Sequence, residues 1–295
     1  ACDSEADVFK ALDLQYIPPE LREDSGEIDA AEKGKIPKLV EPADLTGTFH
    51  CHSDWSDGEA TLEEMAEGAR ALGLEYLGIA DHSRSLAMAR GLSIERVHEQ
   101  WKAIDALNKK FGPGFRLFKG TECDVLADGS LDFPDEVLAG FDYVVASVHS
   151  RFKMPRDEMT ARIVKAISNP YVTMLGHATG RLLLSRAAYE VDLDAVIDAA
   201  AKHDVMIEIN ASPYRLDLDA THCRRARKKG VTIVVNPDAH SVAGLKDLEY
   251  GVGVARRAWC AAGDLFNTAP LSEVESRLER LRNRARVENA EDPRS

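Results

Sequence analysis

The sequence predicts a parallel, barrel-like α/β fold with its functional site at the carboxyl ends of the strands. Seven short apolar runs alternate with helical patterns from Leu45 onward, as in folds built from strand–helix units. Nearly every run ends in a histidine or an acidic residue, and barrels of this class carry their active sites on that rim. The chain of 295 residues is long enough for one such barrel, which takes about 250 residues, and an appendage.

The seven runs have the length of buried strands, and the stretches between them carry helix signals. The predicted strands are residues 45–52, 76–82, 116–125, 143–149, 172–177, 205–210 and 231–240. Thr61 and Glu64 form a capping box that opens a helix, and Gly73 ends this helix. Ser93 is the predicted N-cap of a second helix, which ends at Gly112. This alternation of strands and helices points to a parallel, barrel-like α/β fold.

The segments that flank the barrel differ from it in composition. Residues 1–44 hold twelve acidic and five basic residues, with a double proline in YIPPELRED. We expect them to form a connector that packs on the main domain. Residues 45–270 form the predicted barrel, and residues 271–295 are predicted to be a surface helix that frays into a tail.

The bulk properties exclude several classes of protein. The net charge of −13 argues against a chain that grips long nucleic acid by itself, because such proteins usually present a basic field. Either the substrate is small, or a local site touches a strand, or a partner domain supplies the grip. No run of eighteen apolar residues predicts a membrane span, and the five scattered cysteines favour a reduced, cytoplasmic protein.

The segment FHCHSDWSDG, residues 49–58, begins a set of metal-capable side chains. His50 and His52 are one residue apart, and side chains alternate across a strand, so both imidazoles are expected on one side. The following runs add more such residues at their carboxyl ends. The full set is His50, His52, Asp57, His82, Glu122, His149, His177, Asp238 and His240. Six histidines at the ends of different strands are hard to explain by packing alone.

Nine nitrogen and carboxylate ligands suit more than one ion, because a catalytic zinc-type site uses about three protein ligands. Three divalent ions are therefore expected, and imidazole with carboxylate fits zinc, manganese or iron better than calcium or magnesium. Three ions and three carboxylates leave a local positive charge, which would draw a phosphate group. The predicted chemistry is attack by an activated water on a phosphoester.

The motifs HCHSDWSDG, ADH, GTE, SVH and PDAH resemble those of the polymerase and histidinol phosphatase (PHP) superfamily over about residues 45–265. The resemblance implies a distorted seven-stranded (β/α)7 TIM-like barrel with a trinuclear metal site. It implies three ion sites: His50, His52, Glu122 and Asp238; Glu122, His149 and His177; and Asp57, His82 and His240. It also implies catalytic roles for Glu122, Asp238 and His240.

A narrower resemblance is to the C-terminal PHP domain of bacterial family X DNA polymerases. It is carried by the segment YIPPELREDSGEIDAAEKGKIPKLVEPADLTG and by SVHSRFKMP. The resemblance implies a manganese-dependent 3′–5′ exonuclease acting on DNA 3′ ends. No nucleotidyltransferase domain precedes residue 1, so the chain is expected to be either part of a longer polymerase or a free-standing relative.

Three residues near the ligands are predicted to bind substrate: Arg151, Arg181 and Asn210. The two arginines follow His149 and His177 on loops and could hold phosphate oxygens, although a solvated loop cation is an equally good interpretation. Asn210 ends the sixth run and could orient substrate or cap a turn. Cys51 and Cys123 flank ligands but fall on the opposite face, so they are predicted core residues.

Three functions remain open at this point. The first is the metal-dependent exonuclease. The second is a small-molecule phosphatase, such as a histidinol-phosphate or nucleotide phosphatase, which the acidic surface favours. The third is a non-catalytic scaffold, and the intact set of nine ligands argues against it. The sequence leaves the oligomeric state and the physiological metal undetermined.

Overall fold

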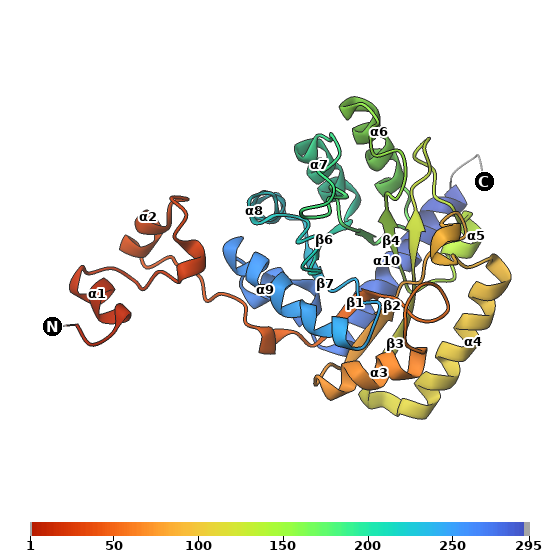
Figure 1. Ribbon diagram of the computed structural model, residues 1–295, viewed down its shortest axis with the longest axis horizontal. Helices are drawn as coiled ribbons and strands as arrows, with labels where there is room; N and C mark the ends of the chain where they lie inside the picture. The colour runs from red at the N-terminus through yellow and green to blue at the C-terminus, as the bar shows by residue number, and fades with distance from the viewer. Residues whose placement is uncertain (1, 292–295) are drawn as a thin grey trace.

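The computed structural model describes residues 2–291 and contains one seven-stranded parallel sheet. The strands pair in sequence order, and the sheet curls into a nearly closed barrel (Figure 1). They are β1 (Gly47–Cys51), β2 (Tyr76–Ile79), β3 (Arg116–Asp124), β4 (Tyr143–Ser147), β5 (Met174–Leu175), β6 (Met206–Asn210) and β7 (Ile233–Asn236). The predicted fold class is therefore confirmed.

Side chains and a loop hold the seam where β1 meets β7. Thr48 Oγ1 donates to the Val235 carbonyl at 3.1 Å, and Asn236 Oδ1 accepts from the Phe49 amide at 3.2 Å. Beyond the strands, the backbone N–H of His52 donates to the Ala239 carbonyl at 2.8 Å. These bonds bring the ends of the first and last strands together, and so they place ligands from both strands on one rim.

Helices cover the outside of the barrel, as Figure 1 shows, while α1 and α2 stand apart from it. The helices of the structure are α1 (Glu5–Ala11), α2 (Glu27–Glu32), α3 (Leu62–Ala71), α4 (Ile94–Phe111), α5 (Asp135–Leu138), α6 (Arg156–Ile167), α7 (Leu193–His203), α8 (Ala220–Lys228), α9 (Leu248–Arg257) and α10 (Leu271–Glu291). The predicted caps are present: Thr61 accepts from the Glu64 amide before α3, and Ser93 accepts from the Arg96 amide before α4. Gly112, in the left-handed region at φ 69°, ends α4.

Two apolar layers account for the packing of the barrel. Outward-facing strand residues form a large buried cluster with the surrounding helices, and Cys51 lies in it. Cys123 is also fully buried among apolar neighbours, as expected for a core residue. Inward-facing residues fill the amino-terminal half of the barrel, where Phe49 packs edge-on against Tyr143 with ring centroids 4.9 Å apart.

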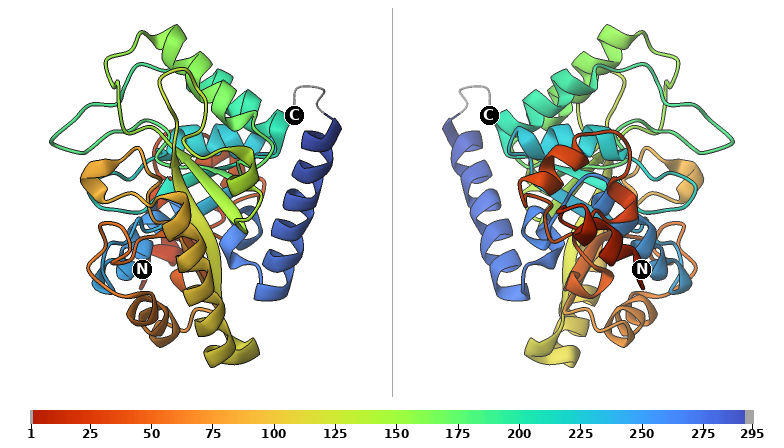
Figure 2. Two further views of the ribbon diagram at one scale, coloured as in Figure 1. Left: turned by 90° about the vertical axis from the view of Figure 1, so that its right-hand side faces the viewer. Right: turned by 90° about the vertical axis from the view of Figure 1, so that its left-hand side faces the viewer.

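Helix α10 closes the amino-terminal end of the barrel, which we call the base. Val274 and Leu278 are buried in the same cluster as the inward-facing aromatic residues. Figure 2 shows α10, in blue, along one side of the molecule. The prediction of a surface helix over this segment was therefore incomplete, because one apolar stripe of the helix seals the core. The predicted frayed tail at 292–295 lies outside the described residues.

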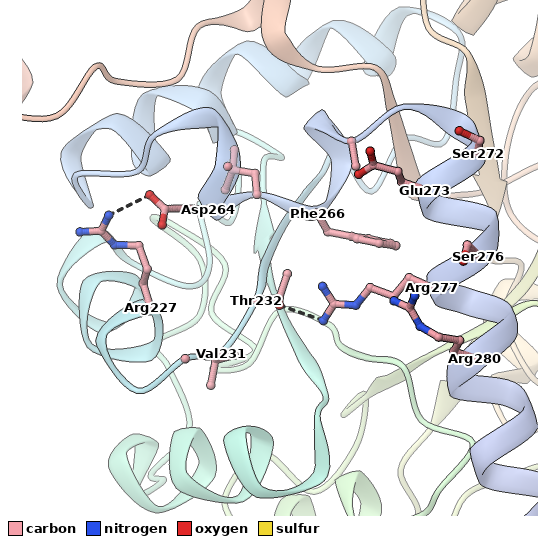
Figure 3. A pocket seen from close by; sticks show the side chains of 14 residues that line it. Arg227, Val231, Thr232, Asp264, Phe266, Ser272, Glu273, Ser276, Arg277 and Arg280 are labelled. Carbon is pink, nitrogen blue, oxygen red and sulfur yellow. Dashed lines mark hydrogen bonds and ion pairs between the residues drawn. The ribbon is translucent and has the colours of Figure 1, made fainter.

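The base also carries a hollow of about 810 Å³ between the end of α8, the start of β7 and α10 (Figure 3). Two of its arginines are engaged by neighbouring side chains: Arg227 lies 2.8 Å from Asp264, and Arg277 donates to Thr232 Oγ1 at 2.9 Å. Among the described residues, no cluster of metal-capable side chains lies at this hollow. The groups suited to chemistry are at the opposite end of the barrel.

Residues 1–44 form α1, α2 and two short 3-10 turns that stand to one side of the barrel in Figure 1. Ile17, Leu21 and Leu39 bury apolar surface together with Trp259, which follows α9. Arg256 of α9 adds ion pairs to Glu20 and Glu41 in this segment, at 2.8 and 2.6 Å. Within the part of the chain that is described, no helix is long and apolar enough to span a membrane.

Candidate metal centre

The first strand delivers two histidines to the rim by an irregular backbone. His50 has φ 54°, in the left-handed region, and the pairing of β1 with β2 shifts register between Thr48 and Cys51. The expected simple alternation of His50 and His52 is therefore wrong in detail, because a bulge intervenes. Both rings still face the centre: their Nε2 atoms lie 3.6 and 3.2 Å from Asp238 Oδ1.

The other predicted ligands stand at or just beyond the carboxyl ends of their strands. Glu122 lies near the end of β3, and a parallel bridge joins it to His82, three residues after β2. His149 and His177 each follow their strand by two residues, after β4 and β5. Asp238, two residues after the end of β7, has φ 53°, and two residues later His240 also faces the centre. The carboxyl ends of five strands therefore converge on one point.

Glu122 is at the middle of the group, and its two oxygens face different histidines. Oε1 lies 2.8 Å from His177 Nε2, 3.1 Å from His149 Nε2 and 3.2 Å from His50 Nε2. Oε2 lies 3.0 Å from His82 Nδ1 and 3.6 Å from His52 Nε2. A carboxylate in this position can bridge neighbouring ion sites, and this geometry fits the role that the resemblance implied for Glu122.

A second group lies nearer to solvent. Asp57, His82 and His240 offer ligand atoms within 4.8 Å of one another, together with His52. Asp57 Oδ2 is 3.4 Å from His82 Nε2, and Asp57 Oδ1 is 3.4 Å from His240 Nε2. The side chains of Asp57 and His240 are 32% and 39% exposed, whereas His50 and His52 are fully buried. The centre is therefore closed at depth and open on the side of Asp57 and His240.

The electrostatics of the group follow from burial and mutual charge. Burial and the neighbouring His240 and His82 lower the pKa of His52 to about 4. Burial disfavours the charge of Asp238, but His50 and His52 hold its pKa well below the usual range. Ionised carboxylates and neutral imidazoles are the forms that bind metal ions. Asp238 and His52 thus have the protonation states of ligands at neutral pH.

The donor set fits divalent ions on independent grounds. Five buried imidazole nitrogens have no hydrogen-bond partner: His50 Nε2, His52 Nδ1, His52 Nε2, His82 Nδ1 and His177 Nδ1. Buried polar atoms without partners cost free energy, and native structures contain few of them. Most of these nitrogens face carboxylate oxygens without the alignment of a hydrogen bond. This arrangement is typical of first-row divalent metal sites, for which imidazole and carboxylate are suitable ligands.

A buried carboxylate that the sequence analysis did not predict contacts two of the histidines on the side toward the barrel interior. Glu208 of β6 is fully buried, and its Oε2 lies 2.6 Å from His50 Nδ1. Its Oε1 accepts from the His177 amide at 3.0 Å, and Asn236 Nδ2 donates to Oε2 at 2.8 Å. The signal was present in VMIEIN, since a lone acidic residue inside an apolar strand is rarely buried without a partner.

Two further aspartates orient predicted ligands through hydrogen bonds. Asp124 Oδ1 lies 2.5 Å from His149 Nδ1, which leaves Nε2 of that ring directed at Glu122. Asp81 accepts from the Ser53 amide at 2.8 Å and from Ser56 Oγ, and it thereby fixes the turn that leads to Asp57. Carboxylates that hold a ligating ring in one tautomer are usual in metal sites.

The three predicted substrate-binding residues have different surroundings. Asn210 is fully buried, and its amide donates to Asp238 Oδ2 and to Glu208 Oε1 at 3.0 Å each. Arg181 Nε donates to the Arg215 carbonyl at 2.8 Å, so its guanidinium braces the next loop. Arg151 is exposed on the loop after β4. Contact of these three residues with substrate stays a prediction.

Arg215 is a second residue that the sequence did not single out. Its Nε lies 3.3 Å from Asp238 Oδ2, and its Nη1 is buried without a hydrogen-bond partner. The residue lies in the loop between β6 and α8, five residues before α8 begins at Ala220. Only the folded loop brings it to the centre, so spacing along the chain gave no signal.

The sequence is similar to known proteins over most of its length. Residues 48–212 match the PHP domain family, and residues 1–23 match the DNA polymerase beta thumb family. The chain is 42% identical over 277 residues to the DNA polymerase/3′-5′ exonuclease PolX of Bacillus subtilis (strain 168), which covers 94% of this chain and 48% of that protein. It thus spans about half the length of that relative.

A shorter relative matches much of the chain, and a solved structure shares its fold. A probable phosphatase of Caldicellulosiruptor saccharolyticus is 32% identical over 202 residues, or 65% of this chain and 78% of that protein. The histidinol phosphate phosphatase of Lactococcus lactis shares the fold with a TM-score of 0.54 at 17% identity, over 72% of this chain and 94% of that one. On the family match and these relatives, the chain belongs to the PHP family.

Proposed function

We propose that this chain is a metal-dependent phosphoesterase that removes nucleotides from the 3′ ends of DNA. The observation that carries the proposal is the convergence of nine ligand-type side chains on one rim, with five buried imidazole nitrogens that lack hydrogen-bond partners. A purely structural cluster of this composition would pair those nitrogens. Divalent ions would satisfy them and would offset the charge of the three carboxylates.

We divide the nine residues among three divalent ions as the resemblance implies. His50, His52, Glu122 and Asp238 would hold the first; Glu122, His149 and His177 the second; Asp57, His82 and His240 the third. In support, ligand atoms of Asp57, His82 and His240 lie within 4.8 Å of one another, as do those of His50, His52 and Asp238, and Glu122 groups with His177 and, separately, with His149. Manganese and zinc suit this donor set, and iron would also suit it. In the crystal structure of the Lactococcus lactis phosphatase, zinc is present together with L-histidinol and phosphate.

Divalent ions in such sites supply an activated water near neutral pH and neutralise charge on phosphate oxygens. The protein's own residues set the geometry around them. Asn210 and Arg215 fix the orientation of Asp238, while Glu208 fixes the ring of His50. Because Asp57 and His240 lie on the open side, a scissile phosphate would approach there.

We assign contact with that phosphate to Arg215 and Arg151. The unpartnered Nη1 of Arg215 can donate to a phosphate oxygen, and the exposed guanidinium of Arg151, on the loop after β4, can donate to another. Water attacks the phosphorus of the terminal phosphodiester, and the bond from phosphorus to the 3′ oxygen of the preceding nucleotide breaks. That oxygen takes a proton, so the products are a nucleoside 5′-monophosphate and a DNA strand one nucleotide shorter.

The choice of DNA 3′ ends as substrate is supported by the likeness to the Bacillus subtilis protein, which is named as a 3′-5′ exonuclease. The match of residues 1–23 to a polymerase thumb points the same way, because a polymerase-type segment then precedes the barrel in the same chain. The net charge of −13 is consistent with a grip on DNA that is local or is shared with another domain.

A small-molecule phosphatase is the second candidate. It is favoured by the 32% identical relative, which is named a probable phosphatase, and by the acidic character of the chain. A scaffold without activity is less well supported, because none of the nine ligand positions is substituted.

The test is a time course with manganese on a 5′-labelled single-stranded oligonucleotide, beside a small aryl phosphate monoester. We expect a ladder that shortens from the 3′ end and disappears when EDTA is added. Phosphate release from the monoester without a ladder would replace the exonuclease by the phosphatase. No turnover of either substrate by metal-loaded protein would overturn both.

A further inference from the structure

We propose that two loops at the rim form a platform on which the unpaired base at the DNA 3′ end stacks, with Tyr214 as the stacking side chain. The loops are residues 178–186, after β5, and residues 211–217, after β6. This inference rests on the proposed function and adds to it the part of the substrate that lies beside the scissile phosphate. In Figure 2 the green-to-teal loops project from the side of the barrel away from α10.

The two loops are bound into one unit by hydrogen bonds. The Leu183 amide donates to the Tyr214 carbonyl at 2.7 Å. Arg181 donates to the carbonyls of Arg215 and Leu216. The amide and the hydroxyl of Thr179 both donate to Asp217 Oδ2 at 2.9 Å. The side chains on this unit are therefore presented from a fixed backbone and not from two independent loops.

A third rim loop braces the same unit. The Arg186 guanidinium lies over the ring of Phe152, with Cζ 3.9 Å from the ring centroid, and its Nε donates to the Gly180 carbonyl at 2.9 Å. Phe152 also stacks on Tyr189, with centroids 6.3 Å apart. Both rings are thus engaged with neighbouring side chains, whereas the ring of Tyr214 has no such contact with another ring or cation among the described residues.

Large side chains on this unit face solvent. Tyr214 is 72% exposed and Leu184 is 110% exposed, next to the exposed Leu183. Leu184 also has φ 62°, a conformation that a leucine adopts only when its surroundings impose it. Strained, exposed residues in a well-bonded loop are found most often at binding sites. Neither exposure nor strain contributes to the stability of the fold, so a ligand is the better explanation.

The platform adjoins the phosphate site. Tyr214 directly precedes Arg215, whose Nε is 3.3 Å from Asp238 Oδ2. In a nucleotide the base lies one sugar away from its phosphate, so a phosphate held near Arg215 places a base beside Tyr214. An aromatic ring binds any base through its face, at about 1–3 kcal/mol per base. Such contact requires no positive charge, which suits a chain with a net charge of −13.

The test uses Tyr214→Ala and Tyr214→Phe, with Leu72→Ala as an exposed apolar control at the far end of α3. An oligonucleotide with 2-aminopurine as its 3′-terminal base reports stacking by fluorescence quenching, and a phosphorothioate at its last linkage slows cleavage. The same variants are assayed with manganese on a normal oligonucleotide and on bis(p-nitrophenyl) phosphate, which has no base.

We expect wild type, Tyr214→Phe and Leu72→Ala to quench the 2-aminopurine, and Tyr214→Ala to lose the quenching. Tyr214→Ala should raise the KM for the oligonucleotide by about 5- to 100-fold and leave turnover of the aryl ester within twofold of wild type. Equal losses on both substrates, or no quenching by wild type, would overturn the platform. Quenching without a ladder would overturn the exonuclease and keep the platform.

Discussion

The rim and the base of the barrel are built from the same seven strands, but different interactions hold them together. Phe49 and His50 are neighbours in β1, yet Phe49 packs among the aromatic rings of the base while His50 faces three buried carboxylates. At the base, apolar burial stabilises the fold without any ligand. At the rim, buried charges and unpartnered nitrogens depend on ions to be satisfied.

The difference teaches that stability and chemistry are separated along each strand. The base seals the core with α10, and the rim carries the strained backbone of His50 and Asp238. Strain at a functional site persists when the surrounding structure is rigid enough to impose it. Changes at the base should therefore alter the free energy of unfolding, whereas changes at the rim should alter metal binding and hydrolysis.

The largest effect is expected for Asp238→Asn, which keeps the shape of the side chain and removes its charge. Asp238 faces His50, His52 and Arg215, so its loss should reduce hydrolysis on the order of 10³-fold or more. The circular dichroism spectrum should stay that of wild type. Asp157→Asn, at an exposed position in α6, is the control. Activity within tenfold of wild type in Asp238→Asn would show that Asp238 is not part of the centre.

The converse change is Leu278→Ala at the base. Leu278 is buried between α10 and the inward-facing rings, so its truncation should lower the free energy of unfolding by about 2–4 kcal/mol. Urea unfolding measures this, and kcat of the folded enzyme should remain that of wild type. Arg280→Ala, on the exposed side of the same helix, should change stability by less than about 0.5 kcal/mol. If kcat of Leu278→Ala falls while its free energy of unfolding is unchanged, the base and the rim do not have separate roles.

The meeting of the ligand-type side chains at the rim could be predicted from sequence because they are polar residues at the ends of apolar runs. His149, His177 and Glu122 stand out in this way, and the alternation of runs gives the parallel barrel. The bulge at His50 could not be predicted, because it depends on the pairing of β1 with β2 and on the contact with β7. The apolar stripe of α10 that packs against the base of the barrel was not predicted, because most residues of this helix are polar.

The loops gave the least information. Arg181 and Arg215 are both arginines in loops. Arg181 donates to a backbone carbonyl, whereas Arg215 pairs with Asp238, and nothing in their local sequence predicts this difference. The hydrogen bond from Arg181 to the Arg215 carbonyl joins loops whose residues are 34 positions apart. It therefore depends on how the fold places the ends of β5 and β6. Glu208 carried a signal, a charge within a buried strand, but its partner His50 is 158 positions away.

A pH-dependent effect is expected from Asp217, which anchors the rim loops through Thr179. Burial raises the pKa of Asp217 to about 6, against a usual value of 3.8, so the native state binds more protons than the unfolded chain between about pH 4 and 6. The stability contributed by the protonated carboxyl is present below about pH 4 and is lost as the pH rises through about 6. The full difference corresponds to roughly 3 kcal/mol.

Asp217→Asn should remove this dependence. Urea unfolding at pH 4, 5, 6 and 7 should show the wild type losing up to about 3 kcal/mol relative to Asp217→Asn as the pH rises. Asp194→Asn, an exposed residue of α7 paired with Arg225, is the control and should follow the wild-type curve. Parallel curves for wild type and Asp217→Asn would mean that Asp217 is ionised throughout this range in the native state.

The smallest effect is expected for Glu208→Gln, and it bears most directly on where the base ends and the rim begins. Glu208 is as deeply buried as the apolar residues of β6, but it touches His50 Nδ1 at 2.6 Å and the His177 amide at 3.0 Å. Glutamine has nearly the same shape as glutamate, but it lacks the negative charge that Glu208 holds beside the imidazole of His50. Changes of this kind typically weaken metal binding or activity by about 10- to 100-fold.

Calorimetric titration of EDTA-treated Glu208→Gln with manganese measures this loss, with exposed Glu249→Gln as the matched control. If the manganese affinity falls while urea unfolding of the metal-free protein is unchanged, Glu208 belongs to the rim despite its depth. If the metal-free protein loses stability and the affinity is unchanged, Glu208 belongs to the core of the base. Because Glu208 is fully buried, substrate contact cannot account for either result, and the boundary between packing and chemistry can be placed within β6.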